Sequence, residues 1–186
     1  MQRRWLRIII AFAFVVFVIQ WAYRWNRERR YDPLILAASQ RYGIDPALVK
    51  AVIWRESRFH ASARGRVGEI GLMQVREPAA YEWAAAEKKP NFSPRFLYDP
   101  DTNIFAGAWY LSQLLKRYRG TGDPVAYALA DYNAGRTHVL RWMHGAAKTN
   151  SAEFLQRMDF PGTRRYIESV RRRYEHYKDA FRRDGK

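Results

Sequence analysis

Apolar residues recur along most of the chain at the three- and four-residue spacing of an α-helix. In the clearest stretch, Val49, Val52 and Ile53 share one helical face, and Glu56 continues the same line. A sustained alternation of apolar and polar residues, which is typical of a half-buried strand, does not occur. The pattern therefore predicts a mainly α-helical fold.

Turn and cap residues divide this pattern into separate helices. Aspartate followed by proline opens helices after Asp45 and Asp123, because aspartate caps free N–H groups and proline suits the first turn. Gly43, Gly120 and Gly135 each end a helix. The predicted helices cover residues 33–42, 46–59, 78–87, 104–119, 124–134, 137–144 and 163–183, with a glycine-punctuated loop over 60–71 and a proline-rich connection over 89–103.

The N-terminal segment differs from these helices because it is apolar on all sides. Residues 6–23 are interrupted only by Arg7 and Gln20, and as a helix they would reach about 27 Å, close to the hydrocarbon thickness of a bilayer. Trp5 and Trp25 flank the segment like interfacial anchors. A cleavable signal peptide is the alternative, but it requires small residues where this chain is bulky and charged. An uncleaved transmembrane helix is therefore predicted.

The length of 186 residues allows one compact domain with short appendages. We predict a membrane anchor and basic flank over residues 1–30, a folded domain over 31–175 and a basic C-terminal tail over 176–186. Arginines lie on both sides of the apolar segment, so the positive-inside rule does not set its orientation.

Positive charge is concentrated at the two ends of the chain. The net charge is +15, of which residues 3–30 carry +6 and residues 157–186 carry +5. This distribution suits an anionic membrane surface or polymer, and solubility alone is the simpler alternative. A nucleic-acid-binding protein is not expected, because its basic stripe would run through the folded body. The absence of cysteine excludes disulfides and thiolate catalysis.

Glu56 is the first candidate for chemistry. It continues a buried stripe into the last turn of its helix, where desolvation and the negative end of the helix dipole both raise a carboxyl pKa. A raised pKa is what a general acid requires near neutral pH. The alternative is a glutamate at the solvated end of a helix. The adjacent Ser57 is close enough to hydrogen-bond nearby, although a cap or surface role fits equally.

Two further stretches carry polar groups among apolar neighbours. In the first, Gly71 permits an unusual backbone angle, Met73 offers a flexible apolar contact and Gln74 offers both a donor and an acceptor. In the second, Tyr132 and Asn133 precede a helix-ending glycine. A turn followed by core residues is the alternative for both stretches. The four histidines lack metal-ligand spacing, and no phosphate-binding loop or nucleophilic serine pattern occurs, so no metal or cofactor is predicted.

Taken in order, Glu56-Ser57, GLMQ at 71–74 and YNAG at 132–135 resemble the signature of the soluble-lytic-transglycosylase-like (SLT) catalytic domain, family 1 of the lytic transglycosylases. TRRYIESV at 163–170 resembles the closing motif of that domain and contributes Tyr166. The resemblance extends over residues 33–170. It implies a lysozyme-like (goose-type) helical fold and an enzyme of the cell wall.

The resemblance also implies a reaction. The substrate would be peptidoglycan glycan strands, cleaved at the β-1,4 bond between N-acetylmuramic acid (MurNAc) and N-acetylglucosamine (GlcNAc) to give 1,6-anhydro ends. Glu56 would be the catalytic acid and then base, the muramyl N-acetyl group the internal nucleophile, and Tyr132 an orienting residue. One carboxylate suffices in substrate-assisted enzymes. The residues implied in substrate binding are Ser57, Gly71, Met73, Gln74, Asn133 and Tyr166.

The chain departs from the family pattern near these motifs. Glu69 stands where a small residue is usual, Gly65 where serine is frequent, and Gly162 where an acidic residue often precedes the last motif. Glu69 is either a second carboxylate near the site or a surface loop residue.

Two other functions stay open, namely a lysozyme-type hydrolase of the same bond and a non-catalytic peptidoglycan-binding anchor. The substrate would place the domain in the periplasm or on the outer face of the cytoplasmic membrane. A partner in the cell-envelope machinery is left open.

Overall fold

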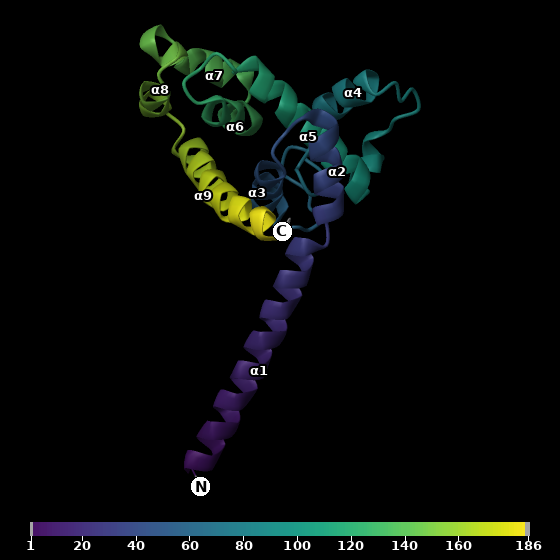
Figure 1. Ribbon diagram of the computed structural model, residues 1–186, viewed down its shortest axis with the longest axis vertical. Coiled ribbons are helices and arrows are strands. Elements are labelled where there is room, and N and C mark those ends of the chain that lie inside the picture. Colours follow the sequence, from purple (N-terminus) through teal and green to yellow (C-terminus); the bar gives the residue numbers. More distant parts are fainter. Residues whose placement is uncertain (1, 185–186) are drawn as a thin grey trace.

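The computed structural model describes residues 2–184 as a helical domain from which one long helix extends (Figure 1). The α-helices are α1 (Gln2–Arg29), α2 (Asp32–Tyr42), α3 (Pro46–Ser57), α4 (Glu77–Ala86), α5 (Pro100–Arg117), α6 (Pro124–Ala134), α7 (Arg136–Trp142), α8 (Ser151–Arg157) and α9 (Pro161–Asp184), with short 3-10 helices η1 (Pro94–Tyr98) and η2 (Gly145–Lys148). Within residues 2–184, β-type pairing is limited to isolated bridges of Ile70 with Arg64 and Val75. The predicted mainly α-helical fold class is confirmed.

Helix α1 projects away from the domain (Figure 1). Most of the apolar side chains described on it are exposed. Phe12, Phe14 and Phe17 are among the large apolar side chains left uncovered. In the part of the chain that the structure describes, the only candidate membrane span by length and composition includes this apolar stretch. Such a surface is disfavoured in water, which fits a helix that lies in lipid.

Helix α3 forms the centre of the domain. Every residue from Ala47 to Ile53 is buried, so the helix is surrounded rather than packed on one face. Its most extensive contacts are with α9, while α5 packs against α2, α4 and α6. The buried Lys50 pairs with Asp32 of α2 (Nζ–Oδ1 2.5 Å), so its charge has a partner. This packing holds the C-terminal end of α3 in a fixed place.

Some helix boundaries differ from the sequence-based expectation. Helix α5 begins at Pro100 rather than residue 104, because Asp99 caps it by accepting the N–H of Thr102 (2.9 Å). Helix α8 was not predicted, because Phe154 is its one buried residue and its sequence shows no repeating apolar pattern. Helix α9 continues through residue 175 to Asp184, and Tyr177 is buried in the core beyond the expected end of the domain.

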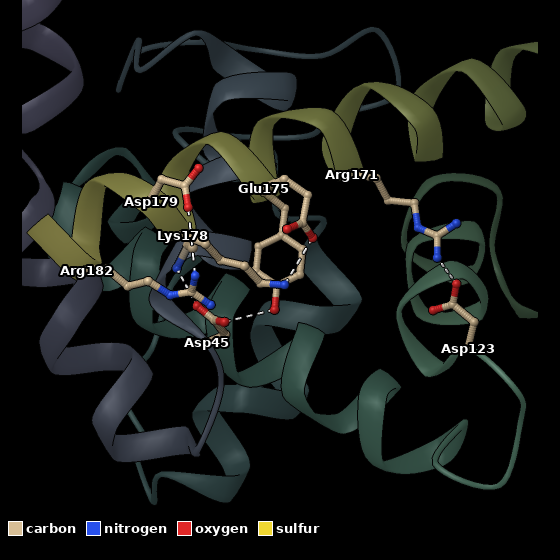
Figure 2. A network of polar contacts seen from close by, with 9 residues as sticks. Asp45, Asp123, Arg171, Glu175, Lys178, Asp179 and Arg182 are labelled. Atoms are coloured by element: carbon tan, nitrogen blue, oxygen red, sulfur yellow. Dashed lines mark hydrogen bonds and ion pairs between the residues drawn. The ribbon is translucent and has the colours of Figure 1, made fainter.

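Helix α9 is joined to the starts of two other helices (Figure 2). Asp45 caps α3 through the N–H of Ala47 (2.8 Å), and its other carboxylate oxygen accepts a hydrogen bond from the Tyr174 hydroxyl (2.8 Å). Asp123 caps α6 and pairs with Arg171. Because α3 ends at the Glu56 motif and α6 at the Tyr132 motif, α9 sets the position of one helix against the other.

Candidate active site

Glu56 lies partly buried in the last turn of α3. The hydroxyl of Tyr166 on α9 donates a hydrogen bond to its Oε1 (2.6 Å). Burial raises the pKa of Glu56 to about 7, against the opposing effects of this hydrogen bond and of the Arg55 charge, and the Glu69 carboxylate raises it further. Glu56 is therefore able to give or accept a proton near neutral pH.

The GLMQ segment is held in place by a tight turn. Gly71 has a φ of +79°, and a Cβ there would lie 2.2 Å from Nδ2 of Asn103, so this position requires glycine. The buried Asn103 amide donates to the carbonyl oxygens of Ile70 and Leu97, both at 2.8 Å. Its Oδ1 accepts the N–H of Met73 at 2.8 Å. Sequence reasoning missed Asn103, because it lies in a stretch expected to be irregular.

Met73 and Gln74 have different surroundings in this turn. Gln74 lines the cleft, adopts a φ of +49°, and donates from Nε2 to the carbonyl oxygens of Ala63 (3.2 Å) and Gly71 (2.8 Å). Met73 is fully buried, and a Cβ on Gly107 of α5 would lie 2.5 Å from its Sδ. Gln74 is thus placed to meet a ligand, whereas Met73 supports the turn from the core.

The end of α6 contributes the next two predicted residues. The Tyr132 hydroxyl donates to the Met73 carbonyl oxygen (2.8 Å), and its ring lies 5.7 Å from that of Tyr110. Burial raises the pKa of Tyr132 well above its ordinary value, and the nearby Glu56 charge adds to this, so the hydroxyl stays protonated. Asn133 Oδ1 accepts a hydrogen bond from the Thr163 hydroxyl (2.9 Å), which links α6 to the start of α9.

These residues surround a cleft of about 550 Å³. Of the residues predicted for catalysis and substrate binding, the cleft wall contains Glu56, Tyr132, Gln74 and Asn133. Tyr110 of α5 also belongs to this wall, and no motif in the sequence pointed to it. The cleft therefore combines one carboxyl group of raised pKa with amide and phenol groups.

The other predicted binding residues lie behind this wall. Ser57 is buried, and its hydroxyl donates to the Ile53 carbonyl oxygen of its own helix (3.2 Å). Tyr166 is buried with its hydroxyl on Glu56. With Gly71 and Met73, they position the residues that face the cleft rather than line it themselves.

Glu69 is a second carboxylate in the wall of the same cleft. Its Oε2 accepts the N–H of Val67 (3.1 Å), and a Cβ on Gly65 would lie only 2.0 Å from that oxygen. The carboxylate thus occupies the space that a side chain at position 65 would take. Gly65 leaves room for the Glu69 side chain, and Glu69 is not a remote surface residue.

The structure is thus a helical domain with a partly buried acid at the end of its central helix. The chain belongs to the family described as the transglycosylase SLT domain, whose model matches residues 33–155. The family predicted from the ordered motifs is confirmed.

Relatives and solved structures agree with this assignment. The chain is 41% identical over 121 residues to membrane-bound lytic murein transglycosylase C of Haemophilus influenzae, covering 62% of this chain and 34% of the relative. It is 36% identical over 118 residues to membrane-bound lytic murein transglycosylase F of Desulfosudis oleivorans, covering 62% and 24%. The chain thus spans about a third or less of these relatives.

Among solved structures, an inactive mutant of the lytic transglycosylase Slt from Pseudomonas aeruginosa superimposes with a TM-score of 0.75 and 27% identity, over 83% of this chain and 25% of that one. The 70 kDa soluble lytic transglycosylase of Escherichia coli gives a TM-score of 0.70 and 27% identity, over 81% and 24%. The same enzyme type has been solved in complex with bulgecin A.

Proposed function

We propose that this protein is a peptidoglycan lytic transglycosylase that cleaves the MurNAc-β-1,4-GlcNAc bond and leaves 1,6-anhydroMurNAc ends. The observation that carries the proposal is Glu56, whose pKa of about 7 makes it an acid in a cleft whose wall also holds the phenol of Tyr132 and the amides of Gln74 and Asn133. The names of its relatives, which are lytic murein transglycosylases, support the same reaction.

In the first step, protonated Glu56 gives its proton to the glycosidic oxygen. The bond from that oxygen to C1 of MurNAc breaks, GlcNAc leaves, and the carbonyl oxygen of the MurNAc acetamido group bonds to C1. The Tyr166 hydroxyl, which already donates to Oε1, stabilises the carboxylate that forms on Glu56. Oε2 is then the oxygen that faces the substrate.

In the second step, the Glu56 carboxylate accepts the proton of the C6 hydroxyl. The C6 oxygen bonds to C1 and displaces the acetamido oxygen, which closes the 1,6-anhydro ring and returns Glu56 to its protonated form. A pKa near 7 suits both steps, because the same group must give and then take a proton. Such acid–base catalysis contributes about 10²–10⁴-fold, and positioning supplies the rest.

The remaining site residues have supporting roles in this proposal. Gln74 and Asn133 lie in the cleft wall and contact the glycan directly. The protonated Tyr132 hydroxyl orients the acetamido group or Glu56. Ser57, Gly71, Met73 and Tyr166 hold these groups from behind.

We propose a location from α1 and the substrate together. The exposed apolar side chains of α1 support a single-pass anchor in the cytoplasmic membrane, with residues 31–175 forming most of the catalytic domain on the periplasmic or outer side. This side is where the glycan strands lie, so substrate access selects an orientation that the flanking arginines leave open.

The test is digestion of purified peptidoglycan by the full chain in neutral detergent, with product masses measured. We expect products lighter by one water than hydrolysis products. Glu56→Gln should lower the rate at least about 10²-fold, whereas Glu168→Gln, a matched change on the exposed face of α9, should leave it unaltered.

Each alternative has its own outcome in this experiment. Products with added water would identify a hydrolase, for which Glu69 would be the water-activating candidate. Release of soluble products by Glu56→Gln at the wild-type rate would show that the proposed acid is not needed. Binding without release by the wild type would identify a peptidoglycan anchor.

A further inference from the structure

A second cavity, of about 500 Å³, lies where α1 meets the domain. One wall comes from the end of α1 and the other from the C-terminal end of α3 and from α9. Trp21, Trp25 and Trp54 line it, with the rings of Trp21 and Trp25 stacked at 5.8 Å. The catalytic cleft has none of these residues in its wall, so the cavity is a separate site.

The cavity carries an excess of positive charge. Arg24, Arg27, Arg58 and Arg173 line it, and Glu28 is the acidic residue in its wall. Across the described residues, none of these four arginines forms an ion pair with a carboxylate. Four guanidinium groups with a single carboxylate among them are arranged to bind an anion.

Two of these guanidinium groups share one indole ring. Arg58 lies 3.4 Å from the ring centroid of Trp54, and Arg173 lies 4.1 Å from the same centroid. Burial and then the charges of Arg173 and Arg55 lower the pKa of Arg58, and the Glu28 carboxylate opposes this shift. Arg58 also adopts a left-handed φ of 52°, a conformation that non-glycine residues keep only where their surroundings hold them.

Arg27 adds a second polar feature to the wall of this cavity. Its Nη1 donates to Nε2 of His60 (2.7 Å), but its Nε is buried without a hydrogen-bond partner. A buried donor is usually satisfied by an acceptor, and a water or an anion in the cavity could take that place.

The position of the cavity along α1 indicates where an anion for this site would come from. With a rise of 1.5 Å per residue, Arg24 and Glu28 lie about 14 and about 20 Å from the middle of the apolar segment 6–23. The hydrocarbon core extends about 15 Å from its midplane, so these residues reach the headgroup layer. Tryptophans are enriched at this interface.

We propose that this cavity binds the phosphate headgroup of an anionic phospholipid, which fastens the catalytic domain to the membrane at the base of α1. The inference rests on the proposed membrane location of α1 and not on the proposed reaction. On α3, Glu56 lies about 200° around the helix axis from Trp54, since successive residues are about 100° apart. The headgroup therefore binds behind the catalytic acid and leaves the glycan cleft open.

The experiment measures lipid binding by the full chain in neutral detergent, using native mass spectrometry with short-chain phosphatidylglycerol and phosphatidylcholine. We expect phosphatidylglycerol to bind at least tenfold more tightly. The double variant Arg58→Gln/Arg173→Gln should lose at least tenfold in this affinity. The control Arg164→Gln/Arg165→Gln removes the same charge from exposed positions of α9 and should change it less than twofold.

A second variant shows whether a loss of lipid binding comes from the missing charge or from misfolding of the domain. Arg24→Glu changes a residue on α1, outside the packed domain, and should also weaken phosphatidylglycerol binding at least tenfold. Equal binding of the two lipids, or equal loss in the α9 control, would overturn the proposal. Displacement of the lipid by inorganic phosphate at equal concentration would assign the cavity to free phosphate, and displacement by a soluble muropeptide would assign it to the glycan.

Discussion

Replacing Glu56 with glutamine should stabilise the folded protein above pH 7 while removing the proposed proton donor. Glutamine keeps the shape of the side chain, and its carbonyl oxygen still accepts the hydrogen bond of Tyr166. It carries no charge to be desolvated. The ionised carboxylate of Glu56 does carry such a charge, and the cost of desolvating it raises the pKa of Glu56 from 4.5 to about 7.

The sign and size of the effect follow from the two pKa values. Below pH 4.5 both the folded and the unfolded carboxyl are protonated, so glutamate carries no penalty. Between pH 4.5 and about 7 the unfolded chain releases a proton that the folded protein retains, and wild-type stability falls as pH rises. Above pH 7 the penalty is complete, at about 3 kcal/mol for full burial. Since Glu56 is partly exposed, about 1–3 kcal/mol is expected.

The assay is thermal unfolding of wild type and Glu56→Gln in the same detergent, below pH 4.5 and above pH 7. A domain of this size shifts its melting temperature by about 2–4 °C per kcal/mol, so the variant should melt about 2–12 °C higher above pH 7. The two proteins should melt alike below pH 4.5. Glu168→Gln should show no such pH dependence. A difference independent of pH, or a less stable variant above pH 7, would refute a desolvated acid at this position.

Three other substitutions test the site. Tyr166→Phe removes the hydrogen bond that lowers the pKa of Glu56, so the alkaline limb of the pH–rate profile should move up by about one pH unit; an unmoved limb would contradict this. Glu69→Gln removes the negative charge that raises the same pKa, so the limb should move down, by less than Tyr166→Phe moves it up; an upward shift would contradict the assigned coupling. Gly71→Ala combines a positive φ with a Cβ contact of 2.2 Å and should lower the free energy of unfolding in urea by at least about 2 kcal/mol. Gly120→Ala, which meets nothing within 4 Å, is its control, and equal losses would contradict the packing argument.

Features that depend on neighbouring residues were predictable from the chain. Asp45 and Asp123 each start a helix, because capping acts within the first turn on the N–H groups next to it. The apolar segment of α1 was predicted in the same way, since its length and composition suffice. Helix α8 was not predicted, because its one buried residue, Phe154, gives no repeating apolar pattern.

The ordered motifs led to the family, but they did not tell which motif residues face the cleft. Ser57 and Met73 stand beside Glu56 and Gln74 in the chain, yet their side chains turn into the core. Side-chain direction depends on what packs against each face of a helix or turn, and that neighbour comes from elsewhere in the chain. Asn103, which supports the GLMQ turn from α5, shows how far such a partner can lie from the motif.

The position of Glu69, and its effect on Glu56, could be assigned only from the folded structure. In the chain it is an acidic residue in a loop, with either a surface or a site position open to it. Folding of residues 60–75 lays its carboxylate over Gly65 and into the cleft of Glu56, where it raises the pKa of the acid. A capping aspartate acts on the turn next to it, whereas Coulomb and desolvation effects act through space, so the proton affinity of Glu56 was set only when distant segments packed together.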